Sequence, residues 1–325
     1  MKMIKVENLV KRYGTNYALD DISFEIGEGE IIGLLGPNGA GKSTTMNILT
    51  GYLSTTSGAA YVNGINILEN PIEAKRNIGF LPEQPPLYQD MTVMEYLNFV
   101  YNLKGCKLER DKHIDEIVNV VKIADVKNRL IKNLSKGYKQ RVGIAQALVG
   151  DPKVIIFDEP TVGLDPKQIL EVRSLIRTLG KKHTVILSTH ILAEVQAVCE
   201  RVIVINKGKI IADEKTENIT KTIEDGYRYQ VKIVGPQSAV KAALERLSGV
   251  KAVEVTGERD MDSFAYRIES ERGADVRRAI FTVCSQNGWP IVGLMPIGTD
   301  LESIFIRLVD ASNGEKAAPK RRRVH

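Results

Sequence analysis

The chain has 325 residues, of which 43% are hydrophobic and 26% charged, so it carries enough apolar surface to bury a full core and is not a disordered protein. This length favours two domains over one. Its apolar runs are broken by charge or glycine well before the roughly 18 residues that a membrane-spanning helix needs. The first residues carry charge where an export signal would be apolar. We therefore expect a cytosolic protein whose membrane role, if it has one, comes from a partner.

The charge of the chain is concentrated near its end. The net charge is +5, and residues 311–325 hold five lysines and arginines against one glutamate. The rest of the chain is nearly neutral, which does not support a general nucleic-acid-binding surface. We expect residues 311–325 to form a basic disordered tail. Contact with anionic lipid and an import-like signal are the alternatives.

The first two thirds of the chain, to about residue 220, alternate short β-branched runs with helical stretches. This is the pattern of an α/β domain with a largely buried sheet. The strand patterns stop between about 92 and 150, where Thr92 and Glu95 have the spacing of a capping box and helical periods follow. We therefore predict a helical insert in this domain. The expected central strands are 30–35, 154–157, 184–187 and 202–205, and the later helices of the insert are 109–122 and 137–149.

A glycine-rich segment at 36–43 matches the pattern GxxxxGK[ST], between an apolar strand that ends at Leu35 and a helical stretch at 44–49. In such a loop the backbone N–H groups wrap a phosphate, and the following helix presents its positive end. Lys42 supplies a point charge and Ser43 offers its hydroxyl to Mg²⁺. The motif predicts a nucleoside triphosphate as ligand. The residues expected to surround its phosphates are Gly36, Asn38, Gly39, Ala40, Gly41, Lys42, Ser43 and Thr44.

Two acids, Asp158 and Glu159, follow the apolar run at 154–157. Two acids at the end of a buried strand are ordinary when nothing else accompanies them, but here they follow a phosphate loop in the same domain. In that arrangement the first carboxylate supports Mg²⁺, through a water molecule, and the second polarises the attacking water. We predict that Asp158 supports the metal and that Glu159 is the general base.

Between these motifs, residues 134–141 read LSKGYKQR and resemble the signature motif of ABC ATPases. The segment departs from the commoner LSGGQ form at Lys136 and Tyr138, but it keeps Ser135 and Gly137. In that family the serine and the glycine reach across a dimer interface to the γ-phosphate bound by the opposite subunit. The helix that follows points its N-terminus at the same phosphate. The resemblance implies a dimer that encloses two ATP molecules.

Four further positions resemble landmarks of the same family. Tyr13 resembles the aromatic residue that stacks on adenine, and Gln84 the Q-loop glutamine that touches Mg²⁺ and senses the membrane subunit. Residues 161–166 are similar to the D-loop, with Asp165 expected near the nucleotide. His190 resembles the switch histidine that contacts the γ-phosphate and positions the attacking water. The resemblance makes Glu159 and His190 the expected catalytic residues.

Residues 79–84 and 301–305 are similar to the exporter-type branch often called ABC-2, which includes gliding-motility and multidrug-type ATPases. The resemblance implies a P-loop ABC ATPase cassette that binds ATP and Mg²⁺ and powers transport. The implied partners are a second copy or a second ABC ATPase, and integral membrane permease subunits that hold the protein at the cytoplasmic face of a membrane. No nucleic-acid partner is expected. Closure around ATP would move the helical insert and the region after Gln84.

Two rival interpretations explain less of the sequence. ABC proteins that act on ribosomes or DNA usually carry two cassettes, a long coiled coil or zinc-binding cysteines, whereas this chain has one cassette and none of those features. A GTPase would carry an [NT]KxD tetrad for guanine, which is absent from the sequence, and would leave the signature-like segment unexplained.

After residue 226 the pattern changes and predicts a small α+β ferredoxin-like domain over 226–310, with a capped final helix that begins near Thr299. Its acids and arginines alternate as on a solvated surface. We favour plain packing against the cassette over a regulatory or dimer-supporting role. The expected elements are strand 228–234, helix 237–247, strand 250–256, strand 263–269, helix 274–286 and strand 289–295.

Overall fold

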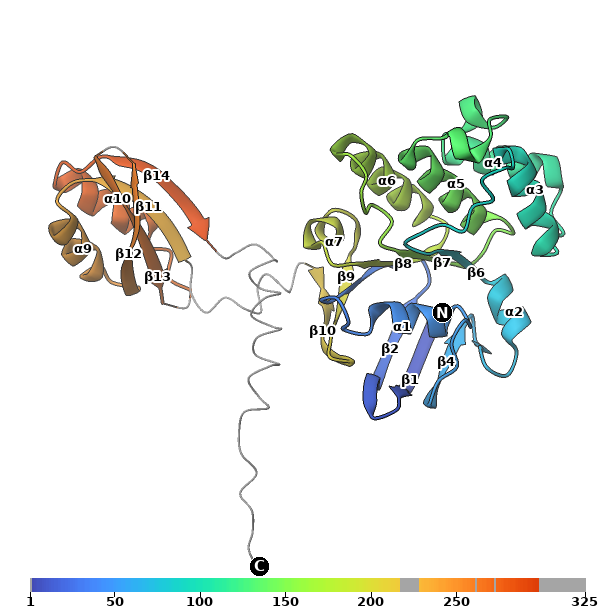
Figure 1. Cartoon of the computed structure of the whole chain (residues 1–325). Helices are drawn as coiled ribbons and strands as arrows, with labels where there is room; N and C mark the ends of the chain where they lie inside the picture. The colour runs from blue at the N-terminus through green and yellow to red at the C-terminus, as the bar shows by residue number, and fades with distance from the viewer. Residues whose placement is uncertain (1, 217–227, 261, 272, 298–325) are drawn as a thin grey trace, which may run out of the picture. The chain divides into compact units, whose positions relative to one another are not determined.

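The computed structural model describes residues 2–216, 228–260, 262–271 and 273–297, and the chain divides between residues 216 and 217 into two compact units (Figure 1). The predicted domain limits at 220 and 226, the final helix and the basic tail at 311–325 lie outside the described residues and stay predictions. No helix in the described part of the chain combines the length and the apolar character that crossing a bilayer needs.

The first unit is built on a six-stranded sheet in the order β10-β9-β3-β8-β7-β6. All neighbours in this sheet are parallel except β10 and β9, which are antiparallel. Every residue of the three central strands is buried, as expected for a parallel sheet covered on both faces. The predicted central strands are confirmed to within two residues at each end. The bounds are β3 (Ile31–Leu35), β6 (Ile78–Leu81), β7 (Val154–Asp158), β8 (Thr184–Thr189), β9 (Arg201–Asn206) and β10 (Lys209–Lys215).

A second sheet, antiparallel and in the order β2-β1-β4-β5, was not anticipated from the sequence. One hydrophobic cluster joins its inner face to α1 and to one face of the parallel sheet, so α1 is packed on both sides. This cluster fixes the direction in which α1 leaves the end of β3. The bounds are β1 (Lys2–Tyr13), β2 (Asn16–Gly27), β4 (Ser57–Val62), β5 (Ile65–Asn66) and α1 (Lys42–Leu49).

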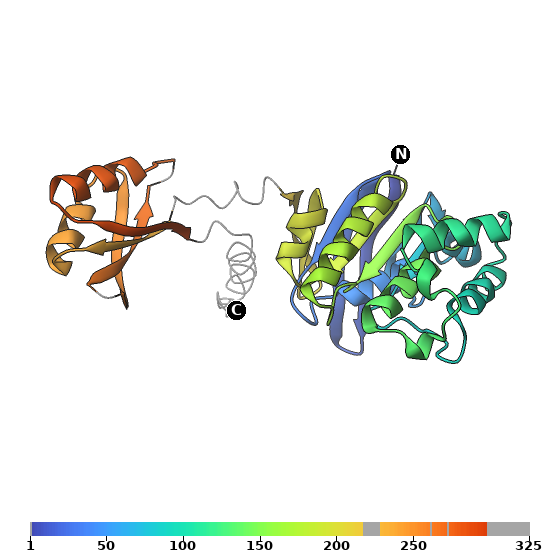
Figure 2. The same cartoon turned by 90° about the horizontal axis from the view of Figure 1, so that it is seen from above.

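The helical insert lies between β6 and β7 in the sequence. The predicted capping box is present at its first helix, where Thr92 and Glu95 each accept a hydrogen bond from the other's backbone N–H. The insert helices and α6 lie on one side of the parallel sheet, with the antiparallel sheet and α1 on the other (Figure 1, and Figure 2 from above). The insert helices are α3 (Val93–Leu103), α4 (Arg110–Val120) and α5 (Lys136–Leu148). The other helices named here lie outside the insert and are α2 (Pro71–Arg76), α6 (Pro166–Leu179) and α7 (Leu192–Val198).

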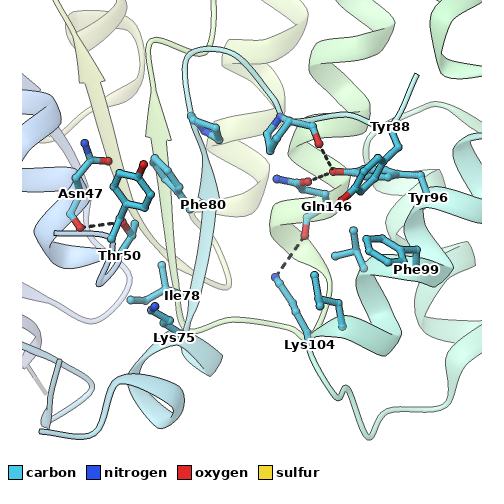
Figure 3. A pocket seen from close by; sticks show the side chains of 15 residues that line it. Asn47, Thr50, Lys75, Ile78, Phe80, Tyr88, Tyr96, Phe99, Lys104 and Gln146 are labelled. Carbon is cyan, nitrogen blue, oxygen red and sulfur yellow. Dashed lines mark hydrogen bonds between the residues drawn. The ribbon is translucent and has the colours of Figure 1, made fainter. Parts of the chain in front are cut away.

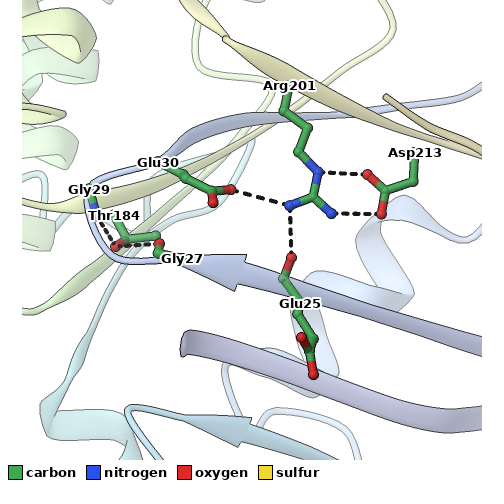
Figure 4. Close-up of polar contacts among 7 residues, drawn as sticks. All are labelled: Glu25, Gly27, Gly29, Glu30, Thr184, Arg201 and Asp213. Carbon is green, nitrogen blue, oxygen red and sulfur yellow. Dashed lines mark hydrogen bonds and ion pairs between the residues drawn. The ribbon is translucent and has the colours of Figure 1, made fainter. Parts of the chain in front are cut away.

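Arg201, on β9, joins the two sheets (Figure 4). Its Nε and Nη2 donate to the two carboxylate oxygens of Asp213 on β10, each at 2.7 Å. Its Nη1 donates to the carbonyl oxygen of Glu25 on β2 at 3.0 Å and to Glu30 Oε2 at 3.3 Å. The Asp213 carboxylate raises the pKa of Arg201. One guanidinium therefore satisfies acceptors from three segments at the junction between the sheets.

The described part of the second unit contains a four-stranded antiparallel sheet in the order β12-β13-β11-β14, together with two helices. Its elements follow one another as strand, helix, strand, strand, helix, strand, and this strand order is that of a ferredoxin-like sheet. Apolar residues of the strands and of both helices form its own core. The bounds are β11 (Arg228–Val234), α9 (Gln237–Glu245), β12 (Val250–Asp260), β13 (Ser263–Ser270), α10 (Arg277–Gln286) and β14 (Ile291–Ile297).

Replacing Arg201 with methionine should destabilise the first unit, because it leaves the Asp213 carboxylate without its cation. We expect a loss of about 2 kcal/mol, or roughly 4–8 °C in the melting midpoint. Lys209→Met removes an exposed ion pair with Asp20 (3.1 Å) and should cost less than about 1 kcal/mol. Calorimetric melting measures both, since the only tryptophan, Trp289, lies in the second unit. Equal losses would contradict the role of Arg201.

Candidate active site

The phosphate loop connects β3 to α1, and two of its glycines are required by close backbone contacts. A Cβ atom at Gly36 would lie 2.3 Å from the carbonyl oxygen of Ile205. At Gly41, which has a φ of 115°, a Cβ atom would lie 2.8 Å from the carbonyl oxygen of Ala18. Any side chain at these positions would push the loop away from β2 and β9. The helix begins at Lys42, two residues earlier than predicted, directly after this left-handed glycine.

Lys42 is buried at the start of α1. Its Nζ donates to the carbonyl oxygens of Gly36 at 2.7 Å and Pro37 at 3.2 Å, so the ammonium group lies against the loop. Burial lowers the pKa of Lys42, and the nearby carboxylates of Glu159 and Asp158 act in the opposite direction. The structure therefore brings the lysine of the loop close to both acids, although they are far apart in the sequence.

The two acids stand at the end of β7, where the parallel register pairs Asp158 with Ser188 of β8. Both acids are buried. Among the described residues, no hydrogen-bond partner reaches Asp158 Oδ1, Glu159 Oε2 or the Ser188 hydroxyl. A buried carboxylate oxygen without a partner is costly, so these atoms have the chemistry expected for a cation or a water molecule.

Glu159 is held in a left-handed backbone conformation, with a φ of 49°. Its N–H donates to the carbonyl oxygen of Ser188 at 2.9 Å, which ties the turn to β8. Its Oε1 lies 2.9 Å from Nδ1 of His190, the residue that follows β8. The predicted base and the predicted histidine are therefore in direct contact, with one carboxylate oxygen held by the ring and the other left free to act. Lys42, Asp158, Glu159 and His190 are called the Lys42 cluster below.

The signature segment begins α5, with Ser135 as its N-cap; the side chain accepts a hydrogen bond from the N–H of Tyr138 at 3.4 Å. Gly137 is buried in the first turn of the helix. Gln140 Nε2 donates to the carbonyl oxygen of Pro160 at 2.8 Å, next to Glu159. Sequence reasoning missed Gln140, which anchors the signature helix to the loop that carries the predicted base.

The remaining predicted residues lie at exposed positions on other segments. Tyr13 is about half exposed (51%) at the end of β1, and Gln84 is exposed in the loop after β6. Asp165 accepts a hydrogen bond from the N–H of Gln168 at 2.9 Å and caps α6. Within the described residues, no hydrogen bond joins Tyr13, Gln84 or Ser135 to the Lys42 cluster. This half of the predicted site is not assembled within the chain.

A glycine loop with a buried lysine, a strand that ends in two acids and a histidine bonded to the second acid define a nucleoside triphosphatase. The family model described as ABC transporter matches residues 19–162. The uncharacterized ABC transporter ATP-binding protein YhcH of Bacillus subtilis (strain 168) is 36% identical, over 78% of this chain and 83% of its own. The bacitracin transport ATP-binding protein BcrA of Bacillus licheniformis is 32% identical, over 94% of this chain and 97% of its own.

Among solved structures, the dimeric post-hydrolysis state of the ATP-binding cassette MJ0796, bound to ADP and Pi, is similar with a TM-score of 0.59 and 30% identity. The similarity covers 66% of this chain and 98% of that one. The chain therefore belongs to the ABC transporter family, as one of its ATP-binding, ATP-hydrolysing subunits. The P-loop ABC ATPase cassette predicted from the sequence is confirmed.

Lys42→Met should weaken ATP binding, because it removes the ammonium group beside the phosphates without removing the loop. We expect a loss of about 10- to 100-fold in affinity, the scale of a hydrogen bond to a charged group. Isothermal titration calorimetry with ATP measures the change. Lys181→Met, at an exposed lysine after α6, is the matched control. Equal affinities in the two variants would contradict the position given to Lys42.

Proposed function

We propose that this chain powers an exporter-type ABC transporter from the cytoplasmic face of a membrane, and that it works as a dimer with a second copy or a second ABC ATPase. The observation that carries the proposal is the pair Glu159 and His190, with one carboxylate oxygen held at 2.9 Å from the ring and the other buried without a partner beside Lys42. Transport is supported by the relative named for bacitracin transport, and export by the resemblance to ABC-2 ATPases.

Dimerisation is supported by the two separate halves of the predicted site. The Lys42 cluster is assembled within one chain, whereas Ser135 and Gly137 belong to a different segment with its own helix N-terminus. In the proposed dimer, each ATP lies between the Lys42 cluster of one chain and the signature helix of the other, with Tyr13 against adenine and Asp165 near the interface. The positive ends of α1 and α5 would then both face the phosphates.

The residues around the phosphate loop fit a magnesium ion, because Asp158 Oδ1 is a buried carboxylate oxygen without a partner in the described part of the chain. We propose that Ser43 and Gln84 hold the ion directly and that Asp158 holds it through a water molecule. Bound Mg²⁺ would neutralise charge on the β- and γ-phosphates.

The chain's own residues account for the proposed hydrolysis. Lys42 and the backbone N–H groups of the loop orient the γ-phosphate. Glu159 Oε2 accepts a proton from water while the water oxygen bonds to the γ-phosphorus, and the bond from that phosphorus to the bridging oxygen breaks to release ADP. His190 holds Glu159 Oε1, so the oxygen that receives the proton is the free one.

A surface pocket of about 670 Å³ is proposed as the docking site for a membrane subunit (Figure 3). One wall comes from the end of α1 and from β6, and the other from α3 and α5 of the insert. Tyr96 OH donates a hydrogen bond toward the carbonyl oxygen of Pro86, at 3.3 Å, and is also in contact with Gln146 of α5. Burial raises the pKa of Tyr96 to about 12.

Aromatic packing adds further contacts between α3 and the segment after Gln84. The ring of Tyr88 lies edge-on to those of Tyr96 (6.0 Å between centroids) and Phe99 (5.3 Å). Tyr88 belongs to the segment after Gln84, whereas Tyr96 and Phe99 belong to α3. A partner helix in the pocket would therefore contact both the insert and the segment that carries Gln84. This is the path along which we propose that movement passes between the permease and the ATP site.

Glu159→Gln should keep ATP binding and abolish turnover, because the amide cannot accept the proton from water. We expect an ATP-held dimer in size-exclusion chromatography and a fall of at least about 100-fold in the Mg²⁺-dependent hydrolysis rate. Glu116→Gln, at an exposed position on α4, is the control and should hydrolyse ATP like the wild type. Rapid hydrolysis by Glu159→Gln would overturn the assignment of the base.

Leu103→Glu should weaken membrane association, since Leu103 lines the pocket and is 73% exposed. A charge there would be buried on docking, which costs more than leaving it in water. We expect a several-fold smaller share of the protein to sediment with membrane vesicles of the source organism. Leu170→Glu, at a 64% exposed leucine on α6 that is outside this pocket, is the matched control. Equal losses would remove the pocket as the docking site.

A further inference from the structure

Glu194, on α7, is a buried carboxylate that neither the phosphate loop nor the Lys42 cluster includes. The residue is 1% exposed. Its Oε1 accepts a hydrogen bond from the hydroxyl of Thr161, and its Oε2 accepts one from the hydroxyl of Thr189 at 2.9 Å. Thr189 Oγ1 also accepts from the N–H of Ile191 at 3.0 Å. Both carboxylate oxygens are therefore occupied, and both hydroxyl hydrogens are fixed in direction.

The two threonines belong to the segments that carry the proposed catalytic pair. Thr161 lies two residues after Glu159, and Thr189 is the residue before His190. The carboxylate of Glu194 thus connects the turn after β7 to the end of β8 through one hydrogen bond to each segment. Thr161 also opens the segment 161–166, which resembles the D-loop.

A buried carboxylate is a costly way to fill this position. Within the described residues, no lysine, arginine or histidine forms an ion pair with Glu194, so two hydroxyl groups and the N-terminus of α7, in whose first turn Glu194 lies, offset the loss of hydration. An apolar side chain of similar length would fill the same space at lower cost. A carboxylate can do what an apolar side chain cannot, because it accepts hydrogen bonds from two different segments and so fixes the separation and orientation of those segments.

We propose that Glu194 is a positioning residue that holds Thr161 and Thr189 together and thereby keeps Glu159 and His190 in contact. The inference rests on the catalytic roles proposed for Glu159 and His190. Glu194 touches neither nucleotide nor water in this scheme, and Lys42 binds the phosphates without it. Loss of the connection should therefore lower turnover and change the surroundings of the His190 ring, while ATP binding is kept.

The test uses the full chain and changes one hydrogen bond at a time. Thr161→Val removes the hydroxyl with little change of shape, Thr161→Ser keeps the hydroxyl, and Glu194→Gln removes the charge with little change of size. Thr178→Val serves as the matched control, because it removes a hydroxyl on α6 whose one hydrogen bond within the described residues goes to the carbonyl oxygen of Ser174. The measurements are kcat and KM for ATP, the melting midpoint, and the Cε1–H resonance of His190.

We expect Thr161→Val and Glu194→Gln each to lower kcat by about tenfold, the scale of one lost hydrogen bond to a charged group, with KM within about twofold of wild type. Thr161→Ser should recover most of the turnover that Thr161→Val loses. The His190 resonance, identified by its loss in His190→Gln, should move in both variants in the same direction as in Glu159→Gln. This readout does not depend on turnover, so the test holds where hydrolysis needs a membrane subunit.

The outcomes separate this inference from the function on which it rests. An unmoved His190 resonance in Thr161→Val and Glu194→Gln, together with a loss of turnover in Glu159→Gln, would overturn the role of Glu194 and leave the proposed base in place. A parallel fall of the melting midpoint, kcat and ATP affinity would show a plain structural role and would also overturn it. Wild-type turnover in Glu159→Gln would remove the proposed base itself.

Discussion

The edge of the parallel sheet at which β3, β7 and β8 end together is the constraint on which the candidate active site depends. Parallel register pairs Leu35 with Thr189 and Asp158 with Ser188, so the phosphate loop, the two acids and the histidine segment leave the sheet side by side. Each strand is buried along its whole length, which leaves its register little freedom to slip. Residues far apart in the sequence therefore lie close together because of the strand register, and the contacts do not require long side chains.

This arrangement concentrates charge in a buried place, and the contacts around it offset the cost. The ammonium group of Lys42 lies near two carboxylates, and its own hydrogen bonds go to backbone carbonyls of the loop. Glu159 has a left-handed backbone conformation, and one oxygen of its buried carboxylate has no hydrogen-bond partner among the described residues. A strained backbone of this kind persists only where the neighbouring structure fixes it. Gln140 supplies part of that support through the carbonyl oxygen of Pro160.

Much of this was predictable from the sequence, for reasons that differ between parts of the fold. Continuous apolar runs predicted the central strands because both faces of those strands are covered. The antiparallel sheet was missed because β1 and β2 depart from a regular alternation. Their register shifts several times, and Asn8 and Asp21 have positive φ values of 45° and 58°, which breaks the period of two on which a strand prediction depends.

The site divides in the same way. Motifs predicted Lys42, Glu159 and His190 as site residues one by one, since the spacing of residues within a loop is visible in the sequence. The contacts of Gln140 and Glu194 could not be predicted from the spacing of residues in the sequence. Their partners are a carbonyl oxygen and two hydroxyl groups that only the fold brings close. Polar side chains of this kind are found by asking what satisfies a buried atom, a question that needs coordinates.

The contacts around Glu159 also distinguish the part of the site that one chain holds rigid from the part whose residues stay exposed. Glu159 is fixed by His190 through its side chain, by Ser188 through its backbone and by Gln140 through the next residue, so the proposed hydrolytic half of the site has little freedom within a single chain. The residues predicted to complete the nucleotide site stand exposed on other segments. In the proposed dimer, a rigid half and a separate exposed half would make turnover depend on assembly, because the approach of a second surface changes what surrounds the phosphate. Such a dependence suits the proposed transport function, since hydrolysis would then be controlled by the geometry of the complex rather than by the supply of ATP.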